Sequence, residues 1–413
     1  MPEFLKLMPP KEALALLMQA LPPRKPLSEM VETLLAVRRT SAEEVRSAQA
    51  LPTFARSSMD GYAVRASDTF GASEGMPGYL ALAGEAPMGA SPAFALQPWQ
   101  AAVIHTGGML PQNADAVVAL EQTQVAGSGE IEVMRAVAKG ENVVLVGEDV
   151  REGQVVIRSG MRIRPVEAGG CMALGITRLR VAVKPKIGII SSGDEVVAPE
   201  QRPEPGQVRD VNSYTLAALV SEAGGEPVLF GIVPDELEEI KKRITRALSE
   251  CQAVVITAGS SASARDMTAE AITAQGLPGV LVHGVAVRPG KPTILAVCDG
   301  KPVIGLPGNP VSAAVIAGLF VVPVVRRLLG ETVERPTGAY SARLTVNVPS
   351  QAGREDWIPV RLSRDKDTSA WQAEPIFSKS NLIFSLAAAD GLFCIPLDVT
   401  GLQAGEQVEV ILI

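Results

Sequence analysis

The sequence predicts a multidomain α/β protein: a doubly wound domain, a β-rich lid domain, an extended helical/β linker domain and a small C-terminal β-barrel. Residues 180–328 alternate apolar strand-like runs with helical patterns, which is typical of a parallel sheet covered on both faces. Residues 335–413 alternate polar and apolar positions, as the strands of a small barrel or sandwich do. Residues 51–150 combine glycine, proline and short apolar runs, which indicates a small β-rich unit.

The expected boundaries follow these changes of pattern. The linker domain takes residues 1–50 and 140–180, the lid 51–139, the doubly wound domain 181–330 and the barrel 331–413. An apolar stripe at 13–21 predicts a first helix, and the residues after Ser28 suggest a second one. Ser41, followed by Ala-Glu-Glu, resembles an N-cap and first helical turn.

Within the doubly wound domain, each element is predicted from its own pattern. We expect strands at 186–190, 227–233, 253–257, 280–287 and 302–305, and helices at 213–223, 235–249, 269–274 and 310–329. The uncharged stretch 302–325 is long enough to suggest a membrane span. Its prolines and the turn signal at 308–310 instead favour a strand, a loop and a buried helix.

Composition excludes several classes of protein. The chain has 413 residues, of which 47% are hydrophobic and 20% charged, so it is long enough for two to four folded domains. A net charge of −7 argues against a nucleic-acid-binding surface. Two histidines and four dispersed cysteines without a CxxC motif argue against a zinc site or a redox dithiol. Charges interrupt the first 20 residues, so we expect no signal peptide and a cytoplasmic protein with free thiols.

Four unusual loops follow predicted strands of the doubly wound domain, where open parallel sheets bind ligands. They are residues 191–195 (Ser-Ser-Gly-Asp-Glu), 258–266 (Ala-Gly-Ser-Ser-Ala-Ser-Ala-Arg-Asp), 288–292 (Arg-Pro-Gly-Lys-Pro) and 306–312 (Leu-Pro-Gly-Asn-Pro-Val-Ser). Small residues let backbone N–H groups approach an anion, and Pro310 suits the first turn of a helix whose N-terminus attracts phosphate.

Charged residues in these loops extend the prediction. Arg288 and Lys291 would add positive charge, and Glu195 and Asp266 would supply oxygen ligands for a magnesium ion that bridges phosphates. Together the loops predict a site for a phosphorylated or nucleotide-bearing ligand. Each loop alone could be a turn, a helix start or a flexible connection. None matches a Walker A loop, a GxGxxG fingerprint or a GxSxG elbow.

The lid region contains two further segments of interest. Residues 57–65 place Asp60-Gly61-Tyr62 between apolar neighbours, which could also be a hairpin turn. Residues 104–108 (Ile-His-Thr-Gly-Gly) could be a loop between strands, with His105 as a structural or surface residue.

Six motifs in order carry a family resemblance. They are Met-Asp-Gly-Tyr-Ala at 59–63, Thr-Gly at 106–107, Gly-Glu-Asp at 147–149, Ser-Gly-Asp-Glu at 192–195, Pro-Gly-Lys-Pro at 289–292 and Leu-Pro-Gly-Asn-Pro-Val-Ser at 306–312. The chain resembles the molybdopterin molybdenumtransferases, the molybdenum insertases that also occur as the E-domain of gephyrin-type proteins. The resemblance extends from about residue 25 to the end.

This resemblance implies an elongated homodimer with four domains in each subunit. It implies insertion of molybdate into adenylylated molybdopterin, release of AMP, assistance by magnesium, and molybdenum cofactor as product. The lid of one subunit would face the doubly wound domain of the other, so that two chains build each site. The adenylyltransferase of the same pathway is a candidate partner, and neither nucleic acid nor a membrane is expected.

The resemblance also assigns roles to residues. Asp60 becomes a lid-side acid, and Glu195, Asp235 and Asp266 become the acids of the pterin-binding domain, with Glu195 and Asp266 as metal ligands; Asp235 could instead cap the helix after it. The implied substrate-binding residues are Thr106, Gly193, Gly259, Ser260, Ser261, Arg288, Lys291, Pro307, Gly308, Asn309, Ser312, Ser378 and Ser380, with Arg361 as a weaker candidate.

Four departures from the family pattern keep alternatives open. The loop 258–264 replaces a Ser-Gly-Gly-x-Ser-x-Gly type and is one residue shorter, and its serines and alanines in place of glycines restrict positive φ. Gly-Gly-Met at 107–109 replaces Gly-Ala-Pro, Arg288 replaces a lysine, and residues 378–381 lack the usual glycine. The alternatives are a non-catalytic molybdopterin carrier or scaffold, a tungsten-specific insertase and a molybdopterin adenylyltransferase.

A shared site predicts complementation between two inactive variants. Mixed dimers of an Asp60→Asn chain and an Asp266→Asn chain should recover part of the activity, because one of the two sites would then carry neither substitution. The measurement is activity after co-refolding, with each homodimeric variant as the control. Failure to recover activity in a verified mixed dimer would contradict a shared site.

Overall fold

The computed structural model describes residues 7–127, 129–258, 262–333, 338–366 and 368–413. The chain folds into two compact units, which are described separately. Unit 1 contains Met1–Glu43, Ser159–Arg164 and Arg178–Ile413. Unit 2 contains Glu44–Arg158 and Pro165–Thr177. The finer division into four domains stays a prediction.

A six-stranded sheet lies at the centre of unit 1, in the order β16-β13-β17-β21-β20-β18. Its strands are β13 (Lys186–Ser192), β16 (Glu226–Val233), β17 (Ala253–Ala258), β18 (Pro278–His283), β20 (Ile294–Cys298) and β21 (Lys301–Pro307). The first four in this order are parallel, as predicted, and β20 runs antiparallel to both of its neighbours. Every residue of β17 is buried, because helices cover both faces.

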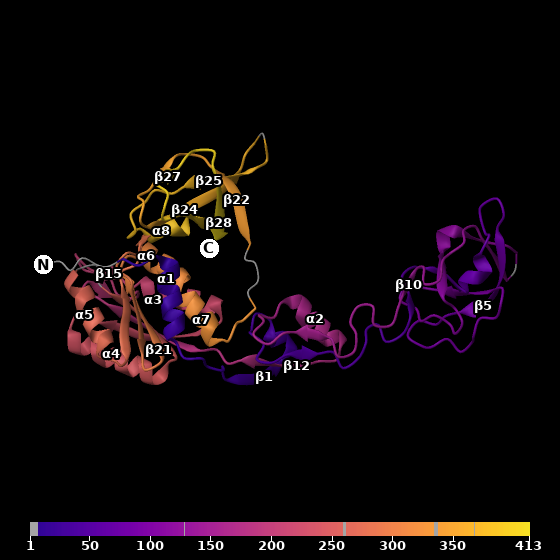
Figure 1. Ribbon diagram of the computed structural model, residues 1–413, viewed down its shortest axis with the longest axis horizontal. Helices are drawn as coiled ribbons and strands as arrows, with labels where there is room; N and C mark the ends of the chain where they lie inside the picture. The colour runs from indigo at the N-terminus through magenta and orange to yellow at the C-terminus, as the bar shows by residue number, and fades with distance from the viewer. Residues whose placement is uncertain (1–6, 128, 259–261, 334–337, 367) are drawn as a thin grey trace. The chain divides into compact units, whose positions relative to one another are not determined.

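The helices divide between the two faces of this sheet (Figure 1). One face packs against α1 (Pro10–Ala20), α3 (Asn212–Ala223) and the helical stretch formed by α6 (Pro310–Ile316), the π-helical turn η4 (Ala317–Val321) and α7 (Val322–Leu328). The other face packs against α4 (Leu237–Glu250) and α5 (Ala262–Thr273). Unit 1 therefore has the doubly wound arrangement that the sequence predicts.

The stretch Pro310–Leu328 is the core helix of this domain. In length and composition it would suit a membrane span, and it is the only helix among the described residues that would. However, 56% of its most apolar window is buried inside the protein, and Phe320 is fully buried among the helices and the sheet. The expectation of a buried helix after a strand and a loop agrees with this packing.

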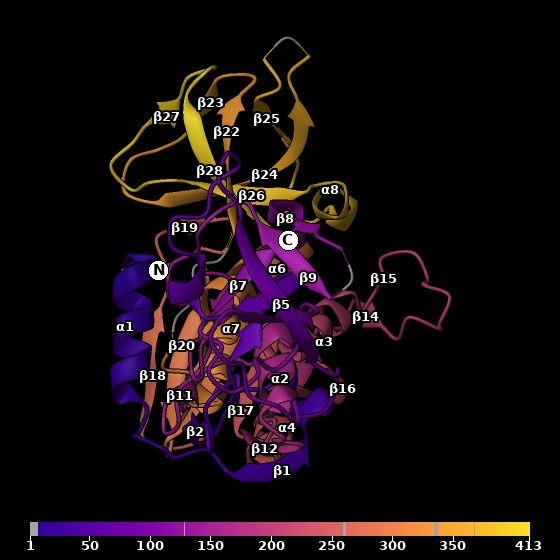
Figure 2. The same cartoon turned by 90° about the vertical axis from the view of Figure 1, so that its right-hand side faces the viewer.

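The C-terminal residues of unit 1 form a barrel. Strands β22 (Ala339–Leu344), β24 (Glu355–Arg364), β25 (Trp371–Pro375), β26 (Gly391–Ile395) and β28 (Gln407–Leu412) close into a ring in the order β24-β25-β22-β28-β26, because β26 pairs with β24. A short strand of the sheet domain, β19 (Val287–Arg288), joins the barrel by pairing with β24. The barrel strands gather at the end of the sheet domain where β19 and α6 lie, beside α8 (Ile383–Ala387) (Figure 2).

Two expectations for the linker region are wrong. The residues after Ser28 form a strand, β1 (Ser28–Glu32), and a single 3-10 turn, η1 (Thr33–Ala36), rather than a helix. β1 pairs with β12 (Arg178–Ala182), a strand that is distant in the sequence. This pairing satisfies the backbone hydrogen bonds of β1 and overrides its weak helical preference. Ser41 caps no helix, since its hydroxyl donates to the carbonyl of Glu43 over 2.7 Å in a local turn.

Two further strands differ from the prediction. The strand expected at 280–287 is divided into β18 and β19, and the two parts belong to different sheets. β20 was not predicted. It is a short buried run between two turns, and its apolar residues do not distinguish a strand from a loop that packs on the core.

Unit 2 is β-rich, as predicted. Its main sheet has the order β7-β4-β6-β5-β9-β8 and contains β4 (Gly61–Val64), β5 (Gly78–Glu85), β6 (Gln100–Ile104), β7 (Ala116–Ala119), β8 (Thr123–Val125) and β9 (Glu130–Val133). Two short pairs, β2 (Val45–Arg46) with β11 (Val155–Ile157) and β3 (Arg56–Ser57) with β10 (Val143–Val144), accompany it. Its helical elements are α2 (Pro165–Ala173), η2 (Ala66–Thr69) and η3 (Leu120–Gln122).

Gly61 is required by the packing of β4 in unit 2. The Gly61→Ala substitution would place a Cβ atom 2.0 Å from the Val118 carbonyl oxygen on the neighbouring strand β7. The backbone would have to move to relieve this clash. We expect it to lower the local free energy of unfolding by about 1–3 kcal/mol, the usual range for overpacking. Native-state hydrogen exchange of the β4 and β7 amides measures this loss.

Gly75→Ala is the matched control in the same unit, because a Cβ atom at Gly75 would meet nothing within 4 Å. Equal protection loss in the two variants would contradict the steric explanation.

Candidate functional site

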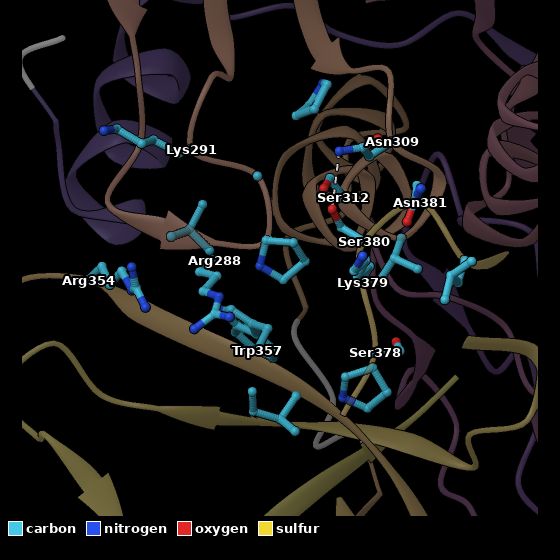
Figure 3. Close-up of a pocket in the computed structure, with 18 of the residues that line it drawn as sticks. Arg288, Lys291, Asn309, Ser312, Arg354, Trp357, Ser378, Lys379, Ser380 and Asn381 are labelled. Atoms are coloured by element: carbon cyan, nitrogen blue, oxygen red, sulfur yellow. Dashed lines mark hydrogen bonds between the residues drawn. The ribbon is translucent and has the colours of Figure 1, made fainter. Parts of the chain in front are cut away.

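Unit 1 contains a cavity of about 1140 Å³ between the sheet domain and the barrel (Figure 3). Three segments surround it: the loop after β19, the end of β21 with the start of α6, and residues 376–382 of the barrel. Trp357 of strand β24 also lines the cavity, as does Arg354, which immediately precedes this strand. The cavity therefore lies at the carboxyl end of β21, where ligands bind in open α/β sheets.

The charges around this cavity all have one sign among its described residues. Arg288, Lys291, Arg354 and Lys379 line it, and no aspartate or glutamate does. Figure 3 shows Arg288 and Arg354 on adjacent backbone segments, and Lys379 beside Ser380. Guanidinium and ammonium groups bind oxyanions by charge-assisted hydrogen bonds, so the cavity is suited to an anionic ligand.

Hydrogen bonds fix the polar wall of the cavity that carries Ser380. The side-chain amide of Asn309 donates to the Ser380 hydroxyl over 3.1 Å, the dashed line in Figure 3. The Val311 backbone N–H donates to the Ser380 carbonyl over 3.0 Å, and the Asn212 side chain donates to the Gly308 carbonyl over 2.8 Å. The first turn of α6 is thereby tied to the barrel, with Pro310 at its first position as predicted.

Glycine at position 290 lets the lysine-bearing loop pack against the core helix. Its φ is +123°, and a Cβ atom there would lie 2.4 Å from the side chain of Ile316. Only glycine combines this backbone conformation with such a close approach. The loop that carries Arg288 and Lys291 is thus held against α6.

Seven of the predicted substrate-binding residues line the cavity: Arg288, Lys291, Pro307, Asn309, Ser312, Ser378 and Ser380. Gly308 lies between two of them and accepts the bond from Asn212. Arg361 is not among the lining residues; it is exposed and lies 4.0 Å from Glu374.

Sequence reasoning missed Arg354, Trp357, Lys379 and Asn381, which also line the cavity. Along the chain, Arg354 opens a run of three charged residues, and Trp357 opens the apolar run that follows it. No local signal distinguishes them. Lys379 and Asn381 adjoin the predicted serines, so the segment as a whole was the available signal.

A separate acidic cluster lies at the carboxyl ends of β13 and β16 in unit 1. The Ser192 hydroxyl donates to Asp235 over 3.1 Å, and the Asp235 backbone N–H donates to the Asp194 carboxylate over 3.1 Å. Burial raises the pKa of Asp235, the nearby charges of Asp194 and Glu195 raise it further, and the bond from Ser192 opposes them. Gly193 has a φ of +145°, and a Cβ atom there would meet the Glu195 carboxylate.

Asp235 is not the cap of the following helix. α4 begins at Leu237, Glu236 occupies the cap position, and no side chain bonds to the helix start there. The capping alternative is therefore wrong, and the half-buried carboxylate remains available for another role.

The structure does not bring the predicted acids into the cavity. Glu195, Asp235 and Asp266 are absent from its lining residues. Asp266 lies on α5 and is exposed, whereas Gly259, Ser260 and Ser261 lie outside the described residues. No group of three or more histidine, cysteine or carboxylate side chains gathers at metal-binding distance in the described part of the chain.

In unit 2, Asp60 and Thr106 form a local cluster. The Thr106 backbone N–H donates to the Asp60 carboxylate over 2.8 Å, and its hydroxyl donates to the same oxygen over 3.1 Å. These bonds hold the pKa of Asp60 below its usual value, and the nearby His105 ring lowers it further. His105 is half-exposed and its other nitrogen lies 3.2 Å from Glu85. Asp60 therefore stays a carboxylate to lower pH than an ordinary aspartate does.

Comparison with known proteins agrees with this architecture. Three family models match in order: the MoeA N-terminal region (domain I and II) at residues 8–175, a probable molybdopterin binding domain at 188–327, and the MoeA C-terminal region (domain IV) at 341–413. The chain therefore belongs to the class of MoeA-type proteins, and the model of a probable molybdopterin binding domain covers most of its doubly wound domain.

Relatives of similar length define the family more closely. The chain is 38% identical to a putative molybdopterin biosynthesis protein of Methanocaldococcus jannaschii, with 93% of this chain and 92% of that protein covered. It is 33% identical to molybdopterin molybdenumtransferase 2 of Mycobacterium tuberculosis, with 87% and 89% covered. A crystal structure of the MoeA molybdopterin biosynthesis protein of Pyrococcus horikoshii matches with a TM-score of 0.85 and 33% identity, covering 99% and 100%. The chain belongs to the MoeA family of molybdopterin molybdenumtransferases.

The Thr106–Asp60 bonds predict a measurable titration. Thr106→Val should raise the pKa of Asp60 toward its ordinary value, because the hydroxyl donor is lost. The pKa should remain somewhat depressed, because the backbone N–H of residue 106 still donates. Carboxyl-carbon NMR titration of Asp60 measures the shift.

Thr123→Val in the same unit is the control, since the Thr123 hydroxyl bonds only to the Leu120 carbonyl among the interactions described. An Asp60 pKa that is unchanged in Thr106→Val would show that the hydroxyl does not hold the carboxylate.

Proposed function

We propose that this protein inserts molybdate into adenylylated molybdopterin and releases AMP in a divalent-cation-dependent step of molybdenum cofactor biosynthesis. Membership in the family of molybdopterin molybdenumtransferases supports this proposal. The observation that carries it is the cavity of unit 1, which is lined by four cations and no described acid. Such a cavity suits a tetrahedral oxyanion.

Molybdate would bind through the cationic wall. Arg288 and Arg354 present planar guanidinium groups that can each donate two parallel hydrogen bonds to an oxyanion, and Lys291 adds a point charge. The buried Ser312 and the barrel residue Ser380 supply hydroxyl groups at the other wall. These donors hold the substrate and favour negative charge that grows during the reaction.

Asp194, Glu195 and Asp235 supply the type of oxygen donor that magnesium prefers, although no three such groups lie at metal-binding distance in the described part of the chain. Asp194 and Glu195 are close enough to Asp235 to raise its pKa, so a cation there would relieve carboxylate repulsion. Carboxylates are the oxygen ligands that magnesium prefers, with waters and phosphate oxygens completing its shell. We assign Glu195 from this cluster and Asp266 from α5 as its protein ligands, as the family resemblance implies. When bound, the ion would polarise the phosphoric anhydride.

The remaining polar residues would position the adenylylated pterin. The turn at Gly193 and the predicted serine loop 259–261 would offer backbone and hydroxyl donors to its phosphates. Asp60, kept ionised by Thr106, would accept hydrogen bonds from donor groups of the ligand. Asp60, Glu195, Asp235 and Asp266 thus keep the roles that the family resemblance gave them.

Assembly and location belong to the same proposal. We expect a homodimer of the 43.3-kDa chain in the cytoplasm, an interaction with the adenylyltransferase of the pathway, and the four domains bounded as predicted from sequence. Light scattering should give twice the mass of one chain, and the mass of a single chain would contradict the dimer.

The decisive experiment measures AMP release from adenylylated molybdopterin with magnesium, with and without molybdate. Wild type should release AMP only when molybdate is present. Asp266→Asn should slow this release by at least roughly tenfold, as the loss of a metal-binding group does. Arg361→Ala is the control, because the exposed Arg361 does not line the cavity.

Each other outcome identifies an alternative. Tight pterin binding without AMP release would indicate a carrier. Release with tungstate but not molybdate would indicate a tungsten-specific insertase. Formation of adenylylated pterin from ATP would indicate an adenylyltransferase.

A further inference from the structure

Asp356 is a buried carboxylate behind the cationic wall of the cavity. Its side chain is completely inaccessible to solvent, and it is not itself among the lining residues. Charged side chains are almost never fully buried unless they are paired, because the loss of hydration costs several kcal/mol. The partners of Asp356 therefore explain why it is there.

Both partners are arginines that line the cavity. Nε of Arg354 lies 2.8 Å from one oxygen of Asp356, and Nη2 of Arg354 lies 3.3 Å from the other. Nη1 of Arg288 lies 3.7 Å from that second oxygen. The buried carboxylate thus holds Arg354 by a forked pair of hydrogen bonds, whereas the largely exposed Arg288, from a different part of the chain, meets it only as an ion pair.

The backbone brings these groups together. β19 pairs with β24 in parallel, and Arg288 is the register partner of Asp356. The Glu355 backbone N–H donates to the Ala286 carbonyl over 2.9 Å, which extends this contact by one more bond. Asp356 therefore sits where the sheet domain is joined to the barrel, and Arg354 lies two residues before it.

We infer that Asp356 is a positioning residue for oxyanion binding: it fixes the orientation of Arg354 and Arg288 so that both face one anion. The forked pair of bonds orders the Arg354 guanidinium, and the charge of Asp356 attracts Arg288 toward the same place. The entropy cost of ordering the arginine side chain then arises during folding rather than during ligand binding. Ligand binding is therefore stronger. The inference rests on the proposed role of this cavity as the molybdate site.

A single carboxylate also leaves the wall positive. Its negative charge balances the positive charge of one of the two arginines, while Lys291 and Lys379 add further positive charge around the cavity. Asp356 opposes an anion by its own charge but aligns the donors that bind it. These two effects have opposite signs, so they can be separated by experiment.

The test measures the molybdate dependence of AMP release and, independently, molybdate binding by titration calorimetry. Asp356→Asn should raise the KM for molybdate and its Kd on the order of tenfold, the loss expected for hydrogen bonds to charged groups, while kcat changes little. Asp356→Glu, which keeps the charge, should recover much of this loss. Asp390→Asn is the control, because Asp390 is a barrel carboxylate that accepts from the Leu362 amide and does not line the cavity.

Two results would overturn the inference. Tighter molybdate binding in Asp356→Asn would mean that Asp356 acts only as an opposing charge. A lower unfolding temperature with unchanged Kd and KM would mean that it only joins the barrel to the sheet domain. If wild type binds molybdate in an Asp356-dependent way but releases no AMP, the inference holds and the proposed enzymatic function fails.

Discussion

The pairing of β19 with β24 is the constraint on which the rest of the site depends. Two residues of the sheet domain, Val287 and Arg288, form part of a barrel sheet, and their partners are Glu355 and Asp356. This contact brings a loop that follows β18 against the first residues of a barrel strand. Without it, the glycine-containing loop and the barrel would not enclose a common cavity. A second contact, from Ser380 to Asn309 and Val311, closes the cavity on the other side.

Separation of charge follows from this construction. The cations gather where the loop, the helix start and the barrel meet, whereas Asp194, Glu195 and Asp235 gather at the carboxyl ends of β13 and β16. A cleft lined by charges of one sign focuses its field and attracts ligands of the opposite sign. The chain as a whole is acidic, with a net charge of −7, so its composition conceals this local positive potential. The cavity is therefore suited to an anion on a protein whose overall charge would repel anions.

Sequence patterns predicted the parts of the fold that depend on local periodicity. Fully apolar runs and helical repeats within short windows predict the strands β13, β16, β17 and β21 and the helices between them, although α5 begins at Ala262 and includes part of the expected loop 258–266. The residues after Ser28 were misjudged because their partner, β12, lies far along the chain. The same limitation explains why Arg354 was missed. Its place in the site depends on contacts with Asp356, which also contacts Arg288, and of these residues only Arg288 lies in a recognisable sequence motif.

The sequence by itself determined the fold class, the family and the loops that form one side of the cavity, because glycine, proline and charged residues in those loops have local conformational and chemical meaning. Only the tertiary structure decided that Arg354, Trp357, Lys379 and Asn381 complete the cavity, and that one buried carboxylate forms ion pairs with two arginines. It also separated the predicted acids from this cavity. The physical reason is that a binding site is a set of distances between distant segments, and those distances are fixed by strand pairing and core packing rather than by any local pattern.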